Sequence, residues 1–179
     1  LKGASISPKP VQADLPVWIG GGSKAAIQRT AKYGTGWQAG PETPEQAAPI
    51  VAAIKAATKL AGRTIDDDHY GAGFPFYFGL PSDPAVARGL EAYKKRTGRD
   101  GTELFAVGDA DVMIERIGRY VEAGVAKFVL RPVGRGDEQI VAQIGGGVAA
   151  HGDDRIAEQA VIDLNVRARY AGYIERQQV

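Results

Sequence analysis

An apolar segment that runs into three consecutive glycines and then into a helix start constrains this chain more than any other sequence feature. Residues 15–19 read Leu-Pro-Val-Trp-Ile, Gly20 to Gly22 follow, and Ser23 begins a helical pattern. Glycine has no Cβ, so it can adopt positive φ and let the backbone approach a ligand closely. The unpaired N–H groups and the dipole of the following helix favour an anion such as phosphate. The alternative is a plain strand-to-helix turn with Ser23 as N-cap, although three glycines exceed what that turn needs.

Extended and helical segments alternate along the chain. Short apolar runs bounded by glycine or proline predict strands, and apolar residues at three- and four-residue spacing predict helices. The predicted strands are residues 17–20, 36–40, 70–78 and 127–132, and the predicted helices are residues 23–33, 43–61, 82–96 and 109–124. Four strands that alternate with helices predict an α/β fold with a parallel sheet.

Two segments carry conflicting local signals. Thr43 and Gln46 form a capping box around Pro44, which predicts a helix start, but Pro49 would delete a backbone hydrogen bond and suggests a later start. The aromatic-rich segment 70–78 contains two glycines and a proline, which suggest a bulge or an edge strand.

The composition is that of an ordinary globular protein. Of 179 residues, 44% are hydrophobic and 24% charged, and the net charge of +1 gives no reason to expect nucleic-acid or membrane binding. The chain has no cysteine and no long apolar or signal-like segment, which favours a cytoplasmic location. Because its two histidines, His69 and His151, are far apart, we predict no metal site.

Several separated motifs occur in an order typical of one known family. They are Pro-Lys-Pro-Val-Gln at 8–12, the glycine junction, Ala-Lys-Tyr-Gly at 31–34, Gly-Trp at 36–37, Asp-His-Tyr-Gly-Ala at 68–72, Val-Gly-Asp at 107–109, Tyr-Val-Glu-Ala-Gly-Val at 120–125 and Lys-Phe-Val-Leu-Arg-Pro at 127–132. Over roughly residues 5–140 the chain resembles the bacterial-luciferase-like superfamily of flavin- and deazaflavin-dependent oxidoreductases. Residues 68–72 are similar to its deazaflavin-using branch.

This resemblance implies a (β/α)8 TIM barrel, of which the chain would supply the C-terminal half. Complete barrels have ~250 residues and rarely fewer than ~200, whereas these 179 residues correspond to the last four βα units. We therefore expect residues 1–150 to form half of a luciferase-like barrel and residues 151–179 to form a helical tail. A half barrel exposes sheet edges and an apolar face, which predicts a homo-oligomer or a complementary barrel half as partner.

The resemblance also implies site residues. Gly20, Gly21, Gly22 and Ser23 would bind the phosphate of FMN or of the deazaflavin coenzyme F-420. The active face of such a barrel lies at the C-terminal ends of its strands. The candidates there for contact with cofactor or a small-molecule substrate are Trp37, Gln38, Gly40, Tyr77, Gly79 and Arg131.

Two of these candidates have other interpretations, and no general base can be named. Trp37 could pack in the core, and Arg131 could pair with Asp137 or Glu138. His69 lies at a strand start, away from the active face, so we interpret it as structural. The predicted function is a luciferase-like monooxygenase or oxidoreductase with catalytic residues partly outside this chain.

Two other functions stay open. Gly20 to Ala25 fits the dinucleotide pattern G-x-G-x-x-A after a strand, and Glu42 is placed to bind a ribose, which would indicate an NAD(P)-binding doubly wound domain. The chain could also be a noncatalytic partner subunit that retains the barrel surface. Within the tail, residues 155–159 and 170–178 resemble a short segment of the GidA family of tRNA-uridine-modifying flavoproteins, from which we transfer no function.

Overall fold

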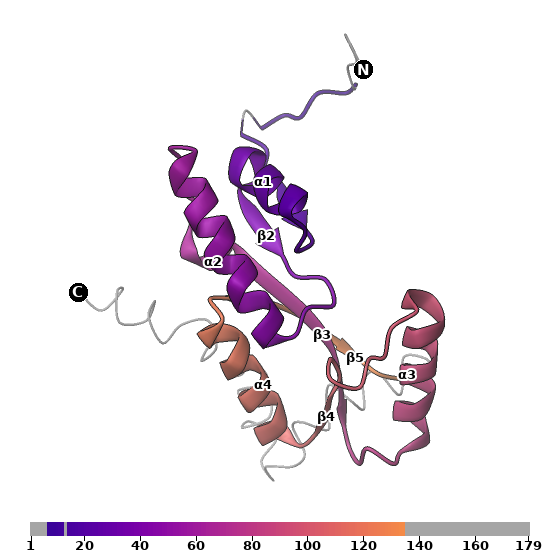
Figure 1. Cartoon of the computed structure of the whole chain (residues 1–179). Helices are drawn as coiled ribbons and strands as arrows, with labels where there is room; N and C mark the ends of the chain where they lie inside the picture. The colour runs from indigo at the N-terminus through magenta and orange to yellow at the C-terminus, as the bar shows by residue number, and fades with distance from the viewer. Residues whose placement is uncertain (1–6, 13, 135–179) are drawn as a thin grey trace, which may run out of the picture.

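The computed structural model of the chain describes residues 7–12 and 14–134 (Figure 1). The strands are β1 (Trp18–Gly20), β2 (Gly36–Gln38), β3 (Tyr70–Phe78), β4 (Ala106–Gly108) and β5 (Lys127–Pro132). The helices are α1 (Lys24–Tyr33), α2 (Pro44–Leu60), α3 (Pro84–Thr97) and α4 (Ala110–Glu122), with a 3-10 turn, η1 (Asp67–His69), before β3. All the predicted strands and the four helices before residue 125 are present, and β4 was not predicted. The predicted tail lies outside the described residues.

The strands form one parallel sheet with β3 at its centre. Gly71 pairs with Gln38 of β2 and with Lys127 of β5, so these two strands flank β3 on opposite edges. β4 pairs with the far end of β3, on the same edge as β2. If the short β4 is set aside, neighbouring strands of the sheet follow the chain order β1-β2-β3-β5, as successive strands of a βα barrel do.

This order bears on the doubly wound alternative. A doubly wound sheet reverses its strand order at a switch point and carries helices on both faces. Here the order does not reverse, and α1, α2 and α4 lie on one side of the sheet (Figure 1). The described residues therefore favour the parallel barrel-like α/β fold, which is confirmed, over the NAD(P)-binding doubly wound alternative.

The two faces of the sheet differ in their side chains. Trp37, Tyr70, Phe74 and Phe76 point to the helices and are buried in the core, where the Phe74 ring stacks on Tyr120 of α4. The alternate positions point to the opposite face, which no helix of the described residues covers. On that face Trp18 is 36% exposed and Val129 of β5 is 53% exposed, so a partly apolar surface is open.

The central strand corrects the expectation for residues 70–78. It is neither bulged nor at an edge, because it pairs on both sides. The glycines of β3 leave space for side chains of the adjacent strand. A Cβ on Gly73 would lie 3.2 Å from the Arg131 guanidinium of β5. The alternate carbonyls of β3 bond to the β5 side, so Pro75 faces the stretch between β2 and β4 where no described strand needs an N–H donor.

The helix starts follow the predicted capping chemistry. Ser23 accepts a hydrogen bond from the Ala26 amide, and Asp109 accepts from the first amides of α4. The capping box between Thr43 and Gln46 is present, and α2 begins at Pro44 and continues through Pro49. The later start that Pro49 suggested is therefore wrong.

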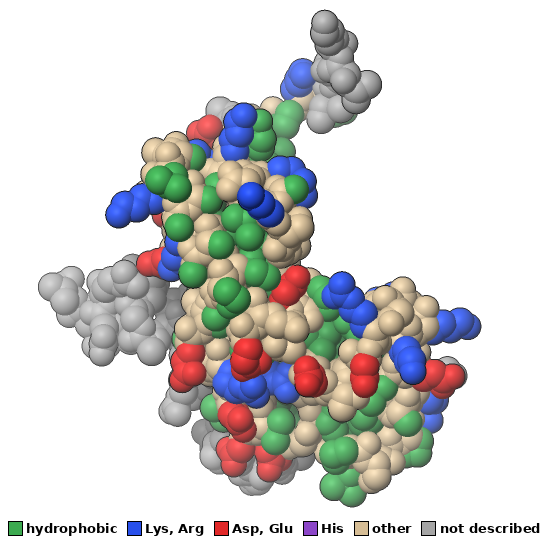
Figure 2. Space-filling view, in the orientation of Figure 1, with side chains coloured by type: hydrophobic (Ala, Val, Ile, Leu, Met, Phe, Trp, Pro, Cys, Tyr) green, Lys and Arg blue, Asp and Glu red, His purple; other side chains and the backbone are tan. Residues whose placement is uncertain are grey.

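Both charge signs are interspersed on the face shown in Figure 2, without a patch of one sign. Among the described residues, no helix is both long enough and apolar enough to cross a bilayer.

Candidate anion-binding cleft

A cleft of about 690 Å³ lies where β1 ends and α1 begins. It is at the C-terminal end of the strand, the side on which parallel barrels carry their active sites. The residues that line it come from three separate parts of the chain. They are Gly20, Gly21, Gly22, Ser23, Ala26, Arg29, Pro41, Glu42, Ile50, Thr97 and Arg99.

The glycine loop presents backbone N–H groups at this cleft. Gly21 has φ of +95°, a conformation that strains any residue with a side chain. Ser23 is extended and caps Ala26, and the helical hydrogen bonds of α1 begin with Ile27. Within the described part of the chain, the amides from Gly22 to Ala25 have no protein acceptor. These free donors and the helix dipole form an arrangement suited to an anion.

Trp37 fixes one end of this loop from inside the core. Its side chain is fully buried, on the helix-covered face of β2. Its Nε1 donates a hydrogen bond to the Gly21 carbonyl oxygen at 3.0 Å. The structure thus places Trp37 behind the glycine loop, where it does not line the cleft.

Two arginines and one carboxylate supply the charges of the cleft. Arg29 lies on α1, two turns after the glycine loop, and Arg99 follows α3. Glu42 lies opposite, with Oε1 3.4 Å from where a Cβ on Gly22 would be. The two cations favour an anion, whereas the carboxylate favours hydroxyl groups beside it.

Hydrogen bonds hold the Glu42 segment in place. The Glu42 carboxylate accepts from the Gly40 amide, and its backbone carbonyl accepts from the Tyr120 hydroxyl at 2.7 Å. Burial raises the pKa of Tyr120 to about 12, so this hydroxyl stays a donor far above neutral pH. Helix α4 therefore positions a cleft residue 78 positions earlier in the chain.

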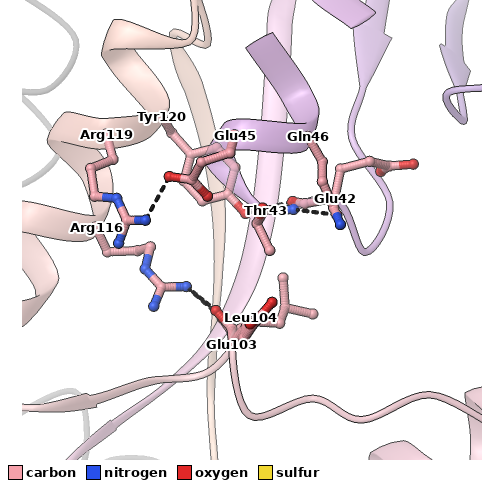
Figure 3. A network of polar contacts seen from close by, with 9 residues as sticks. All are labelled: Glu42, Thr43, Glu45, Gln46, Glu103, Leu104, Arg116, Arg119 and Tyr120. Atoms are coloured by element: carbon pink, nitrogen blue, oxygen red, sulfur yellow. Dashed lines mark hydrogen bonds and ion pairs between the residues drawn. The ribbon is translucent and has the colours of Figure 1, made fainter. Parts of the chain in front are cut away.

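A second polar network lies beside this segment, at the start of α2 (Figure 3). Arg119 of α4 forms an ion pair with Glu45, and Arg116 donates to the Glu103 and Leu104 carbonyls. Hydrogen bonds from the Glu45 backbone amide and from Arg119 lower the pKa of the Glu45 carboxyl. These groups border a smaller cavity of about 230 Å³ and are paired with one another, so they connect α2 to α4.

The other predicted pocket residues do not line the cleft. Gln38 lies on the open sheet face above Gly71, and Gly40 precedes the cleft segment. Tyr77 and Gly79 lie at the end of β3, where burial and the Asp83 carboxylate raise the pKa of Tyr77. The structure therefore separates Tyr77 and Gly79 from the glycine loop, whereas Gln38 pairs with Gly20 across the sheet.

Arg131 has a structural partner. Its Nη2 donates to the Gly73 carbonyl at 3.2 Å, on the stretch of β3 between β2 and β4. The Arg131 guanidinium lies over Gly73, next to the position that a Cβ on Gly73 would occupy. The alternative partners Asp137 and Glu138 lie outside the described residues.

His69 lies in η1, before β3, as the sequence analysis expected for a structural residue. Its Nδ1 is 2.8 Å from the Thr35 carbonyl oxygen. Asp66 and Asp68 have ligand atoms within 4.8 Å of the His69 ring, a spacing that a metal ion could use. However, Asp68 already pairs with Lys127 at 3.1 Å, so one of the three groups has a protein partner.

Neither arginine of the cleft was predicted from the sequence. Arg29 follows Ser23 and Ala26 at three-residue spacing, so the helical periodicity of α1 could have placed it on the cleft side. Arg99 has no such local signal, because it comes from a loop about 75 positions away in the sequence and only the tertiary fold brings it near.

The fold and the cleft together define a class of protein: a parallel, barrel-like α/β architecture with a glycine loop and a cleft at the end of a strand. A family model described as luciferase-like monooxygenase matches residues 1–102, more than half of the 179-residue chain. The chain belongs to this family. Among curated protein sequences, none matches the chain.

Solved structures of this kind share the fold. An F-420-dependent secondary alcohol dehydrogenase, solved with an F-420–acetone adduct, superposes with a TM-score of 0.61 at 15% identity, over 84% of this chain and 52% of that one. The F-420-dependent tetrahydromethanopterin reductase from Methanopyrus kandleri gives 0.51 at 20% identity, over 78% and 51%. The long-chain alkane monooxygenase LadA gives 0.54 at 19% identity, over 87% and 42%. The chain thus spans about half the length of these proteins.

Proposed function

We propose that this chain is part of a flavin- or deazaflavin-dependent oxidoreductase and that its cleft binds the cofactor phosphate. The observation that carries the proposal is the set of free amides from Gly22 to Ala25 beside Arg29 and Arg99. Helix N-termini with glycine loops bind phosphate through such amides. Structural neighbours with the same fold include F-420-dependent enzymes and a riboflavin lyase solved with modified FMN.

The residues of the cleft fit the other polar groups of such a cofactor. FMN and F-420 both carry a polyhydroxylated chain next to the phosphate. Glu42 lies beside the glycine loop and can accept hydrogen bonds from hydroxyl groups. We assign the phosphate to the glycine loop and the arginines, and the neighbouring hydroxyls to Glu42.

When bound, the isoalloxazine or deazaflavin ring supplies the redox chemistry. The described residues would hold the cofactor at its anionic end, and the open face of the sheet is the part of the barrel that they leave uncovered. A second wall above this face is needed to hold the ring close to a substrate and to exclude water from the reacting groups. We propose that a complementary barrel half or a second copy of the chain provides it.

The test is a titration of phosphate-bearing and phosphate-free cofactors into the full chain. We expect FMN to bind more tightly than riboflavin, or F-420 more tightly than its phosphate-free chromophore. Gly21→Ala should remove much of this preference, because its backbone has φ of +95°. Gly62→Ala, at a positive φ of +67° and with no residue of the cleft next to it in the chain, is the control for strain. Equal affinities within both cofactor pairs would refute the proposal.

A noncatalytic role for the chain predicts a different result. A partner subunit that retains only the barrel surface would bind its partner and neither cofactor. Cofactor binding by the isolated chain therefore separates the two functions, whereas turnover does not, since turnover also depends on the second wall.

A further inference from the structure

Trp37 does not line the cleft, but it is bonded to the loop that does. We propose that Trp37 is a positioning residue that directs the Gly22 amide N–H into the anion-binding cleft. This inference rests on the proposed phosphate site. It assigns to a core residue a function in ligand binding that its burial alone does not suggest.

The geometry of one peptide group determines where the Gly22 amide points. The Gly21 carbonyl and the Gly22 amide belong to the same planar trans peptide, so C=O and N–H point in opposite directions. The Gly21 carbonyl points into the core, to Trp37 Nε1 at 3.0 Å. The Gly22 N–H consequently points away from the core, to the side where the cleft lies.

The loop needs such a constraint because it consists of glycines. Three successive glycines have access to many backbone conformations, including both signs of φ. In most of them the Gly22 amide would point elsewhere, and a ligand would bear the entropic cost of ordering the loop. A hydrogen bond from the core fixes one peptide plane before any ligand arrives.

The hydrogen bond from Trp37 to Gly21 can hold the loop in one conformation because the indole N–H cannot easily replace its acceptor. An indole has a single donor, and the buried Trp37 ring is fully excluded from solvent. If the loop turned, the indole N–H would lose its acceptor inside the core, which is costly. The core therefore disfavours the alternative loop conformations.

Packing alone would require the ring of Trp37 but not its N–H group. Trp37 pairs with Ile19 and Tyr70 across the sheet, and an apolar ring of similar size would fill that space. A variant that keeps the ring and removes the donor thus separates positioning from packing.

The experiment compares the full chain with Trp37→Phe and with a chain that carries benzothienylalanine at position 37, which keeps the bicyclic shape without the N–H. Trp18→Phe is the matched control, because Trp18 lies on the open face and its ring contacts His69. Each protein is titrated with FMN and riboflavin, and with F-420 and its phosphate-free chromophore. The quantity compared is the affinity ratio within each pair.

Both position-37 variants should lower the affinity ratio about two- to tenfold, the effect of losing one hydrogen bond, with little change in binding of the phosphate-free partner. Trp18→Phe should leave the ratio unchanged. An unchanged ratio in the benzothienylalanine protein would overturn the role of Trp37 and leave the phosphate site intact. A wild-type ratio near one would overturn the phosphate site itself, and the positioning role with it. If Trp37→Phe does not fold, the benzothienylalanine protein decides.

Discussion

At the scale of single residues, the charges of the cleft depend on two arginines from distant segments. Arg29 and Arg99 both line it, whereas Lys95 lies near the end of the same helix as Thr97 without lining it. We expect Arg29→Gln and Arg99→Gln each to weaken FMN binding about two- to fivefold at low salt, as exposed charges near an anion do. Lys95→Gln should have no effect. Loss of riboflavin affinity to the same extent would show that the arginines do not act on the phosphate.

Titration of the Tyr120 hydroxyl should change the free energy of unfolding at high pH. Its pKa is raised from 10 to about 12 by burial, so the folded state favours the neutral hydroxyl. The stabilisation that this preference provides is complete below pH 10 and is lost as the pH rises from 10 toward 12. The free energy of unfolding should fall there by at most about 1.4 kcal/mol per pH unit.

Tyr120→Phe isolates this contribution. The variant removes the donor to the Glu42 carbonyl and should be about 1 kcal/mol less stable at pH 8. Urea unfolding of both proteins from pH 8 to 11 should show the difference shrinking as the pH rises. Two parallel curves would mean that Tyr120 does not titrate in this range.

At the scale of the elements, two glycines with equally empty surroundings should respond in opposite ways to a methyl group. A Cβ would meet nothing within 4 Å at Gly118 in α4 or at Gly98 after α3. Gly118 is helical, so Gly118→Ala should stabilise the protein by about 0.5–1 kcal/mol. Gly98 has φ of +70°, so Gly98→Ala should destabilise it by about 1 kcal/mol. Thermal unfolding measures both, and a shared sign would contradict the backbone argument.

Local sequence signals predicted the elements well, because caps and periodicity act within a few residues. Ser23, Thr43 and Asp109 all begin helices as their chemistry predicts. The position of β3 in the sheet was misjudged, because its glycines and proline resemble an edge strand. Their reason is tertiary: the space at Gly73 is occupied by Arg131 from β5, 58 positions later.

In the site, as in the elements, local sequence patterns were predictable and tertiary contacts were not. The glycine loop carries its own local pattern and lines the cleft as a continuous segment. Arg99 is far from this loop in the sequence, and only the tertiary fold brings it to the cleft. The core packing of Trp37 was one of the sequence-based interpretations, but its hydrogen bond to the Gly21 carbonyl depends on the tertiary fold and could not be predicted.

At the scale of the whole molecule, we expect one sheet face to determine whether the chain associates. Val129 is exposed on the face without a helix, and Ile114 is similarly exposed on the outside of α4. We expect concentration-dependent association through the open face, since unpaired edges and apolar faces promote it. Val129→Lys should reduce this association in sedimentation experiments, and Ile114→Lys should not. Monomers at every concentration would refute the prediction.

The central claim is that the amides of the glycine loop bind the cofactor phosphate, and their own resonances test it most directly. In the 15N-labelled full chain, FMN should shift the amide signals from Gly22 to Ala25, and riboflavin at equal occupancy should shift them far less. F-420 and its phosphate-free chromophore provide the same comparison for the deazaflavin. If phosphate-bearing cofactors bind but the largest shifts specific to phosphate lie elsewhere in the chain, the phosphate does not bind at the end of β1.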